Sequence, residues 1–350
     1  MSDWSNKLLK WYEANKRDLP WRGIDDPYKI WLSEVILQQT RVNQGWDYYN
    51  RFTEKYPTVS KLAAAAEHDI LKLWQGLGYY SRARNMHHAA KEIVTKHKGK
   101  FPTEHESIRA LKGVGDYTAA AIASIAYKLP YAVVDGNVFR VYSRVLGIST
   151  PIDSTEGKKK IWEAAAELLP KTNPGTYNQA VMELGALCCT PKNPNCPECP
   201  IQIACYAFAH NMVDKLPVKQ GKTKVRNRHL NYIVISNGNK LLLHERKGND
   251  IWKGLNDFPC IETEKETSPE KLLKTKEWKA LFSTDKLIIE SVSGPVKHIL
   301  SHQRLYAQFI KVKTSTPVKT IPADCLWVEK KNLKKYAVPR LIEQYISSHL

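Results

Sequence analysis

The sequence predicts a multidomain protein in which an all-α domain is followed by an α+β domain. Two observations favour this fold class. Apolar residues recur at helical spacing as far as about residue 206, and after residue 229 the apolar pattern changes to the period of two that is typical of strands. A chain of 350 residues is long enough for two separate cores. We expect the all-α domain at 1–208, a basic linker at 209–228 and the α+β domain at 229–350.

The first domain is expected to contain some ten helices with short connections. An amphipathic helix begins near Trp4, and Leu19 to Arg22 lie beyond its end. Asp26 and Pro27 have the N-cap and first-turn pattern of the next helix. Further helical patterns cover 42–52, 70–74, 82–96 and a stretch that ends at residue 111.

The linker is predicted from residues 215–228, which carry six basic residues and no acidic one. Two apolar runs then flank Asn237, Gly238 and Asn239, which is the pattern of a β-hairpin. The expected strands are 232–236, 240–244, 287–292 and 305–312, and the expected helices are 270–282 and 339–347.

The charge of the chain favours a polyanionic partner such as nucleic acid. The 53 Lys and Arg residues exceed the 35 Asp and Glu residues, which gives a formal charge of +18. A basic surface that only aids solubility is the alternative. No apolar run approaches the ~18 residues of a spanning helix, and the N-terminus has no apolar signal region. We therefore expect a cytoplasmic protein of the bacterial type, associated with the nucleoid.

Five of the seven cysteines lie in one short stretch, 184–206. Cys189, Cys196, Cys199 and Cys205 have the spacing C-x6-C-x2-C-x5-C, and Cys188 is left over. Zinc also accepts four thiolates, but it usually binds two separated C-x2-C pairs, and only one such pair is present. An iron–sulfur cluster is therefore favoured over zinc and over cysteines that only pack in a core. Disulfides are not expected in a reducing compartment.

Gly113 and Gly115 separate one helical pattern from the next, within about 107–127. Glycines without side chains, placed before a helix N-terminus, let backbone N–H groups approach a phosphate. The stretch is similar to the hairpin of helix-hairpin-helix DNA-binding proteins. An ordinary turn between helices is the alternative.

Two carboxylates are candidates for chemistry. Glu34 has the apolar neighbours Val35 and Ile36, and burial there would raise its pKa and keep a proton available near neutral pH. Asp135 precedes a helix that begins near Asn137. It could be only an N-cap, and Glu34 could be only a surface residue of its helix.

These motifs together resemble the endonuclease III superfamily of DNA glycosylases and, within it, the MutY-type adenine DNA glycosylases. The order of motifs is the hairpin, then Val-Asp-Gly-Asn around Asp135, then the four-cysteine loop. The specific resemblance lies in 19–22, 33–40, 76–85 and the cysteine loop, which span most of residues 8–205. The resemblance implies a helix-hairpin-helix glycosylase domain with a 4Fe-4S cluster, followed by a Nudix-like domain.

The resemblance also implies roles for the residues around the carboxylates. Glu34 would protonate the leaving adenine, and Asp135 would stabilise the sugar cation. Tyr117 occupies the position at which bifunctional members carry a lysine that attacks the sugar, so a monofunctional glycosylase is expected, with Tyr117 near the reacting sugar. Arg22 and Gln179 are candidates for the adenine pocket.

Adenine must leave the helix before its glycosidic bond can be reached. The resemblance implies that Gln39 and Tyr79 wedge into the duplex, although Tyr79 could also be a core aromatic. In the second domain, Ser301 and His302 would read 8-oxoguanine, but Leu300 replaces the aromatic residue of the family's Phe-Ser-His motif. The region after Gly254 lacks the acidic Nudix box, so recognition without hydrolysis is expected.

The resulting hypothesis is a monofunctional glycosylase that removes adenine mispaired with 8-oxoguanine or guanine in duplex DNA and so starts base excision repair. The cluster would hold a basic loop near DNA, with Lys192 as its visible charge, and would have no redox part in base removal. The alternatives are an endonuclease III-like glycosylase and lyase, against which Tyr117 argues, and a non-catalytic protein that binds DNA damage. We expect a monomer, and no motif indicates a protein partner.

Overall fold

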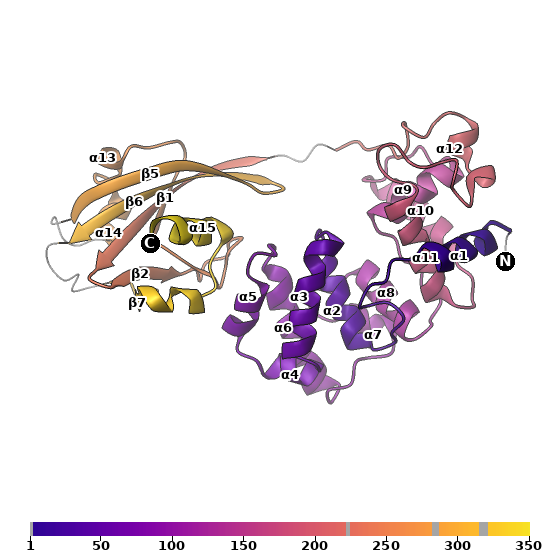
Figure 1. Ribbon diagram of the computed structural model, residues 1–350, viewed down its shortest axis with the longest axis horizontal. Helices are drawn as coiled ribbons and strands as arrows, with labels where there is room; N and C mark the ends of the chain where they lie inside the picture. The colour runs from indigo at the N-terminus through magenta and orange to yellow at the C-terminus, as the bar shows by residue number, and fades with distance from the viewer. Residues whose placement is uncertain (1–2, 222–224, 282–286, 315–320) are drawn as a thin grey trace. The chain divides into compact units, whose positions relative to one another are not determined.

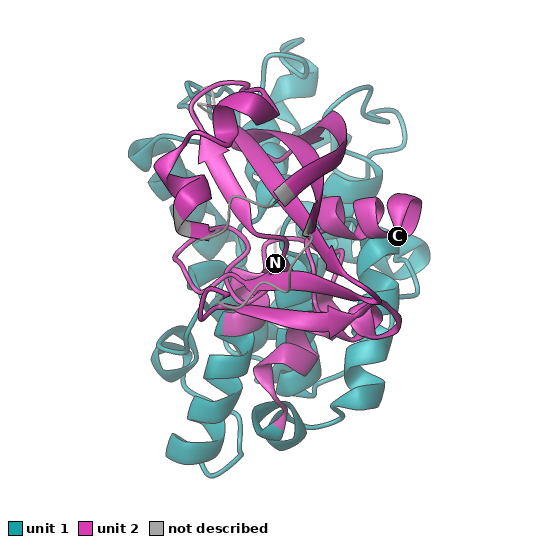
Figure 2. Ribbon diagram, turned by 90° about the vertical axis from the view of Figure 1, so that its left-hand side faces the viewer, with its two compact units in different colours: residues 1–64, 85–221 teal, residues 65–84, 222–350 magenta. Residues whose placement is uncertain are grey.

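The computed structural model describes residues 3–221, 225–281, 287–314 and 321–350. Contacts divide the chain into two compact units, which Figure 2 colours separately: residues 1–64 with 85–221, and residues 65–84 with 222–350. The second unit therefore includes 65–84, a stretch that the sequence prediction assigns to the first domain. Residues 222–224 of the predicted linker lie outside the described residues.

The first unit is all-α in the ranges that the structure describes, as predicted (Figure 1). Its helices are α1 (Asp3–Asn15), α2 (Pro27–Leu37), α3 (Val42–Lys55), α4 (Val59–Ala64), α6 (Ser81–Lys96), α7 (His105–Arg109), α8 (Asp116–Ala126), α9 (Gly136–Leu146), α10 (Thr155–Leu168), α11 (Pro174–Leu187), the 3-10 helix η1 (Gln202–Ala204) and α12 (Tyr206–Ala209). The first turn of α6 belongs to the second unit.

Two packing groups place the residues of interest. Helices α1, α9 and α11 pack around Leu8, Tyr142 and Leu184, which are almost fully buried. Helix α2 packs against α8, and it begins as predicted because the Asp26 side chain accepts hydrogen bonds from the first-turn N–H groups. These contacts fix the C-terminal half of α2 and the first turns of α8 and α9, where the candidate residues lie.

The second unit is an α+β fold with a mixed sheet. Its strands are β1 (Arg226–Asn237), β2 (Lys240–Glu245), β3 (Asn256–Asp257), β4 (Cys260–Thr263), β5 (Leu287–Ile299), β6 (Gln303–Thr314) and β7 (Cys325–Glu329). The order is β3-β2-β1-β6-β5, with β4 paired to β1 and β7 paired to β2. Strands β1 and β6 are parallel, and the other pairs are antiparallel. The predicted hairpin is present, since Ser236 pairs with Leu241.

Helices cover both faces of this sheet. The helices of the second unit are α5 (Glu67–Trp74), α13 (Pro269–Leu272), α14 (Lys276–Leu281), the 3-10 helix η2 (Lys330–Lys335) and α15 (Arg340–His349). On one face, Tyr345 of α15 stacks on Phe309 of β6 with ring centroids 3.9 Å apart. On the other face, Trp278 of α14 packs with Ile233 and Ile310. Residues 230–235 of β1 are buried on both faces, and 232–235 form a continuous apolar run, whereas Gln308 and Lys311 interrupt the apolar residues of β6.

Three details differ from the sequence prediction. The predicted helix 270–282 is two short helices, α13 and α14, and its last residue lies outside the described ranges. Strand β1 begins at Arg226, inside the predicted linker. The short strands β3, β4 and β7 were not predicted, since two to five residues show too little alternation to be recognised.

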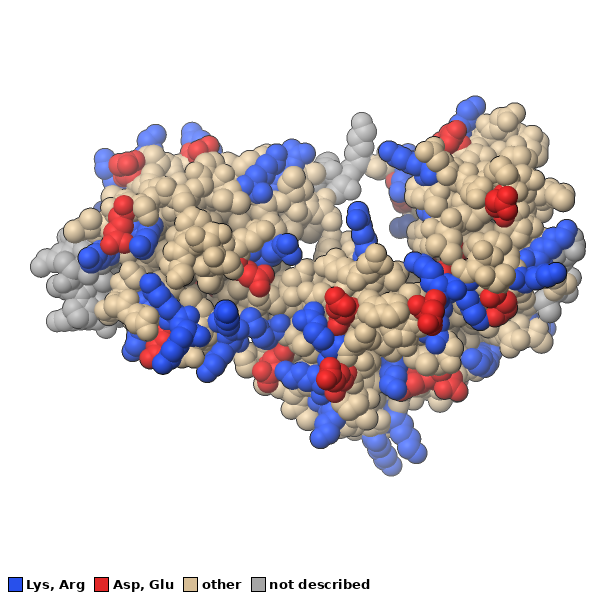
Figure 3. Space-filling view, in the orientation of Figure 1, with Lys and Arg blue, Asp and Glu red and all other residues tan. Residues whose placement is uncertain are grey.

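Residues 65–84 join the second unit through polar contacts to its C-terminal part. Lys72 donates a hydrogen bond to the carbonyl of Tyr336 at 3.0 Å, and Gln75 donates one to Glu343 at 2.6 Å. Basic side chains lie over much of the face shown in Figure 3, with acidic ones interspersed.

In the described part of the chain, no helix has both the length and the apolar character that crossing a membrane requires.

Candidate active site

Glu34, Tyr117 and Asp135 line one cavity of about 270 Å³ in the first unit. Glu34 comes from the C-terminal half of α2, Tyr117 from the first turn of α8, and Asp135 from the residue before α9. The cavity is also lined by Leu37, Gln38, Gln39, Val134 and Gly136. Residues that are about 100 positions apart in the sequence therefore meet, and both predicted carboxylates face the same space.

Glu34 is held in a form that can give a proton near neutral pH. Removal of water around its carboxyl group raises its pKa to about 7, and the negative charge of Asp135 acts in the same direction. The hydrogen bond with Tyr117 and the charge of Arg22 act in the opposite direction, but they are outweighed. The Tyr117 hydroxyl also lies 3.6 Å from the Met182 sulfur. Glu34 can therefore act as a general acid.

Asp135 has two functions in the fold, because it caps α9 and also lines the cavity. Its Oδ1 accepts hydrogen bonds from the backbone N–H groups of Asn137 and Val138, both at 2.8 Å, and its Oδ2 accepts one from the Asn137 side chain at 2.9 Å. Burial raises its pKa, and these hydrogen bonds limit the rise. The capping residue thus also lines the cavity of Glu34, and its catalytic role stays a prediction.

A chain of hydrogen bonds connects Asp135 to the cysteine loop. Arg140 donates from Nη2 to the Asn137 side-chain oxygen at 2.9 Å and from Nε to the carbonyl of Cys189 at 2.7 Å. One turn further along α9, Arg144 donates to the Cys189 sulfur at 3.3 Å and to the carbonyl of Thr190 at 2.8 Å. Both arginines are buried, so α9 ties the loop to the end that carries Asp135.

The five cysteines of the loop line a single small cavity. Besides the thiols of Cys188, Cys189, Cys196, Cys199 and Cys205, its lining is largely apolar, with Arg144, Asn195 and Gln202 as polar members. All five cysteines are free, and in the described residues no three His, Cys, Asp or Glu side chains converge closely enough to hold a single metal ion. The four thiols of the C-x6-C-x2-C-x5-C motif thus line the same cavity, but they do not converge on a position that a single metal ion could occupy.

The predicted hairpin lies between α7 and α8. Gly113 has φ +81°, and a Cβ there would lie 2.7 Å from the Cβ of Asn85 on α6, so only glycine fits. Gly115 is the N-cap of α8 and provides no capping side chain, with open space around its Cα. The N-terminus of α8 therefore has no side-chain cap from Gly115, and its binding of a phosphate stays a prediction.

Gln39 lines the cavity of Glu34 and has φ +55°, an uncommon conformation for a residue with a side chain. Arg22 and Gln179 do not line this cavity. Arg22 donates to Glu183 at 2.6 Å and to the Tyr12 hydroxyl at 3.1 Å, and the same hydroxyl donates to Gln179. Arg22 and Gln179 thus share the Tyr12 hydroxyl as a hydrogen-bond partner, and their role in an adenine pocket stays a prediction.

The second unit has its own cavity, of about 540 Å³. It brings together Tyr79, Leu300, Ser301 and His302, and the hydroxyl groups of Tyr79 and Ser301 are hydrogen-bonded. Tyr79 is not a core aromatic, because it is 37% exposed. Its φ of +48° places it, like Gln39, in the left-handed region that is rare outside glycine. Two residues predicted separately from the sequence therefore lie at one place.

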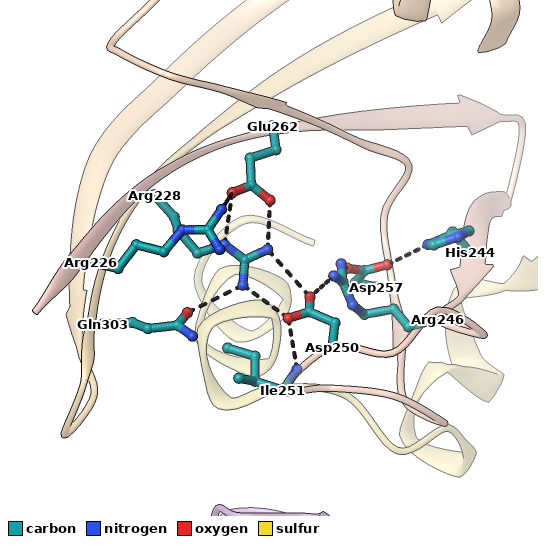
Figure 4. A network of polar contacts seen from close by, with 9 residues as sticks. All are labelled: Arg226, Arg228, His244, Arg246, Asp250, Ile251, Asp257, Glu262 and Gln303. Carbon is teal, nitrogen blue, oxygen red and sulfur yellow. Dashed lines mark hydrogen bonds and ion pairs between the residues drawn. The ribbon is translucent and has the colours of Figure 1, made fainter.

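A buried network of charges lies beside this cavity (Figure 4). Arg228 pairs with Glu262 at 2.6 Å and with Asp250 at 2.9 Å. Arg246 pairs with Asp250 and, at 2.6 Å, with the fully buried Asp257. Asp250, which lines the cavity, is thus held by two arginines.

Sequence reasoning missed Asn137, Arg140 and Arg144. A signal was available: the three polar residues lie three and four positions apart, on one face of a helix that directly follows Asp135. The ion pair between Arg228 and Asp250 left no such signal, because the two residues are 22 positions apart with no common helix.

Comparison with known proteins gives a consistent result. Residues 32–171 match the model of the HhH-GPD superfamily base excision DNA repair proteins, and residues 231–348 match the NUDIX domain model. Two curated relatives are named adenine DNA glycosylase. One, from Buchnera aphidicola subsp. Schizaphis graminum, is 31% identical over 98% of this chain and 97% of the relative. The other, from Homo sapiens, is 32% identical over 95% of this chain and 71% of the relative.

Solved structures agree on the fold of the first unit. A thermostable thymine-DNA glycosylase is 29% identical with a TM-score of 0.55, over 59% of this chain and 94% of that one. A trapped endonuclease III–DNA covalent intermediate has a TM-score of 0.51 at 22% identity, over 59% of this chain and 95% of that one, and shows the fold alone. The predicted fold class is confirmed. With relatives that match almost end to end, the chain belongs to the adenine DNA glycosylases of the HhH-GPD superfamily.

Proposed function

We propose that the protein is a monofunctional glycosylase that hydrolyses the N-glycosidic bond of adenine mispaired with 8-oxoguanine or guanine in duplex DNA. The observation that carries the proposal is the cavity in which Glu34, with a pKa of about 7, and Asp135 face the same space. Its volume of about 270 Å³ is close to the ~300 Å³ at which ligand pockets begin, and suits a single base.

The chemistry follows from the two carboxyl groups. Glu34 in its protonated form donates its proton to a ring nitrogen of adenine, which makes the base a better leaving group. The sugar is left with cationic character, and the negative charge of Asp135 stabilises it. Glu34, now a carboxylate, accepts a proton from the attacking water. The hydrogen bond from Tyr117 stabilises that carboxylate, because it lowers the pKa of Glu34.

Strand cleavage is not expected to accompany base removal. A lyase needs an amine that attacks the sugar carbon, and Tyr117 fills the position of the family's lysine. A phenol whose pKa burial raises well above its usual value is a weak nucleophile at neutral pH. The product is therefore an abasic site in an intact strand.

Binding of duplex DNA is supported by the net charge of +18 and by the α8 N-terminus behind Gly113 and Gly115. Adenine has to be turned out of the stack to enter the cavity. Gln39, strained and exposed at its rim, suits the role of a wedge that fills the vacated space. Tyr79, the second predicted wedge, belongs to the cavity of the second unit.

That second cavity is proposed to read the base opposite adenine. The hydroxyls of Tyr79 and Ser301 can donate or accept hydrogen bonds at the edge of an oxidised guanine, and His302 lies in the same lining. Leu300 offers only an apolar contact where the family has an aromatic ring. Recognition here would raise the preference for 8-oxoguanine without any chemistry in the second unit.

A 4Fe-4S cluster is the proposed cofactor of the cysteine loop. Cys189, Cys196, Cys199 and Cys205 fit it, because a cluster spaces its ligand sulfurs further apart than one ion does, and four thiols line one cavity. The apolar lining would shield it from water. Arg144, which donates to the Cys189 sulfur, would stabilise the charge of that thiolate. When bound, the cluster would supply structure to the loop, not electrons to base removal.

The test is a single-turnover assay on an end-labelled duplex with adenine opposite 8-oxoguanine, with and without hot alkali. Wild-type protein should give strand breaks only after alkali, and Glu34→Gln should give none while it binds the duplex normally. Breaks without alkali would reveal a lyase and contradict the monofunctional assignment. No breaks from the wild type in either lane, with binding intact, would mean that the protein recognises damage without excising adenine.

A further inference from the structure

The cysteine loop contains one thiol more than a four-ligand centre needs. Cys188 ends α11 as its C-cap, its backbone N–H bonded to the carbonyl of Leu184 at 2.9 Å. Its side chain is 5% exposed and lines the same cavity as the four predicted ligands. The extra thiol is thus not elsewhere in the core but inside the proposed cofactor site.

Cys188 lies next to one ligand in particular. A hydrogen bond joins the thiols of Cys188 and Cys199, although the residues come from different segments, the end of α11 and the turn before η1. The second hydrogen bond of Cys188 goes to the carbonyl of Asn195 at 3.2 Å, inside the same loop. Cys205 differs, since its sulfur is 3.6 Å from the carbonyl of Arg144. The two thiols that touch therefore occupy one corner of the cavity.

We propose that Cys188 is a reserve ligand for the cluster and takes the corner of Cys199 when that thiol is lost. This inference rests on the proposed 4Fe-4S cofactor. In the exchange, the Cys188 thiol gives its proton to solvent and its sulfur bonds the iron that Cys199 no longer holds. Two equivalents of a peroxide can oxidise the Cys199 thiol to a sulfinic acid, with release of two waters, and this loss is irreversible in most proteins, so a second thiol at the same corner can preserve the cluster.

The position of Cys188 favours this exchange over a role in packing alone. A ligand has to approach from a fixed backbone, and the end of α11 is held in the core formed with α1 and α9. A buried cysteine that only fills space behaves as a small apolar residue and is replaceable by valine in every background. A reserve ligand is replaceable only while Cys199 is present.

The test compares four variants of the full chain: Cys199→Ser, Cys188→Val, the double variant, and Cys205→Ser as the matched control at a corner without a spare thiol. Each is purified without oxygen and assayed for iron, sulfide and visible absorption of the cluster. Protection of Cys188 from alkylation in Cys199→Ser, read by mass spectrometry, reports directly on the exchange.

Cys199→Ser and Cys188→Val should both retain the cluster, whereas the double variant and Cys205→Ser should lose it. In Cys199→Ser, Cys188 should resist alkylation. If Cys199→Ser loses iron, or fails to fold while Cys188→Val folds, the reserve role is wrong although the cofactor assignment stands. If wild-type protein prepared in this way binds no iron and sulfide, the cofactor proposal fails, and this inference fails with it.

Discussion

The cavity lined by Glu34 and the cavity lined by Ser301 each contain a carboxyl group with a shifted pKa. The pKa of Glu34 is raised, whereas that of Asp250 in the second cavity is lowered. Burial raises the pKa of Glu34 to about 7. Burial acts on Asp250 too, but the hydrogen bonds and charges of Arg228 and Arg246 outweigh it and hold the pKa of Asp250 below its usual range. At Glu34 burial outweighs the partners that lower the pKa, whereas at Asp250 the partners outweigh burial.

The difference separates chemistry from recognition. Burial, with the charge of Asp135 acting in the same direction, raises the pKa of Glu34, so Glu34 keeps a proton that it can transfer. Asp250 is fixed in its ion pairs, and the hydroxyls of Tyr79 and Ser301 and the ring of His302 are among the polar groups that the cavity offers to a ligand. Glu34 in the first cavity can therefore exchange a proton near neutral pH, whereas Asp250 in the second cavity stays ionised.

The largest effect is expected for Asp135→Asn. Loss of the negative charge should lower the single-turnover rate of adenine release by about 10²–10³-fold. An asparagine caps a helix about as well as aspartate, so the unfolding free energy should change by less than ~0.5 kcal/mol. A normal rate would show that Asp135 is only a cap, and a large loss of stability would show that the rate measurement reports misfolding.

Breaking the charge network of the second unit should affect stability and not chemistry. Arg246→Met leaves Asp257, which is fully buried, without its arginine, so the second unit should lose about 3 kcal/mol of stability in denaturant unfolding. The excision rate from an adenine–guanine duplex, measured where the variant is folded, should stay near that of the wild type.

Arg226→Met is the control for this prediction, because Arg226 also pairs with the network but is 71% exposed. Its stability should hardly change. Equal losses in the two variants would mean that the buried pairs matter no more than the exposed one.

A smaller effect is expected for Ser301→Ala. Removing one hydrogen-bond partner should reduce the preference for 8-oxoguanine over guanine opposite adenine by about 2–10-fold. Competition between the two duplexes in one reaction measures this ratio. Ser291→Ala, on strand β5, which ends just before Ser301, and outside the cavity, should leave the ratio unchanged. If both serines behave alike, the second cavity does not read the opposing base.

The smallest effect is a shift in pH dependence. The wild-type rate should fall as pH rises through about 7, because Glu34 then loses the proton that it donates. The hydrogen bond with Tyr117 lowers the pKa of Glu34, so Tyr117→Phe should move this fall to higher pH. A single-turnover pH–rate profile of both proteins decides it. Movement to lower pH would mean that Tyr117 favours the protonated acid.

Local patterns predicted much of this molecule. Asp26 and Pro27 predicted the start of α2, and the change of the apolar pattern to a period of two after residue 229 predicted the sheet. Asp135 was the harder case: the sequence offered a cap or a catalytic group as alternatives, and the structure shows the cap on a residue that also lines the cavity proposed as the active site. A sequence pattern describes local structure only. It cannot show that one residue both caps a helix and lines a cavity formed with distant residues.

Long-range contacts could not be predicted. The grouping of residues 65–84 with the second unit depends on bonds such as that from Lys72 to Tyr336, 264 positions away, and such a bond leaves no periodicity in either segment. The hydrogen bond between Tyr79 and Ser301 is similar. The resemblance to a family gave each residue a role, but only the fold of the unit brings them into one cavity.

The double function of Asp135 also bears on how the chain would decay if its activity were no longer needed. A lineage released from selection for excision could replace Glu34 freely, since Glu34 contributes burial cost and no cap. Substitution of Asp135 by a residue that cannot cap a helix would still be resisted, because it would loosen the first turn of α9. An intact residue at 135 is therefore a poor marker of a working enzyme among related genes. The residue at 34 is the informative one.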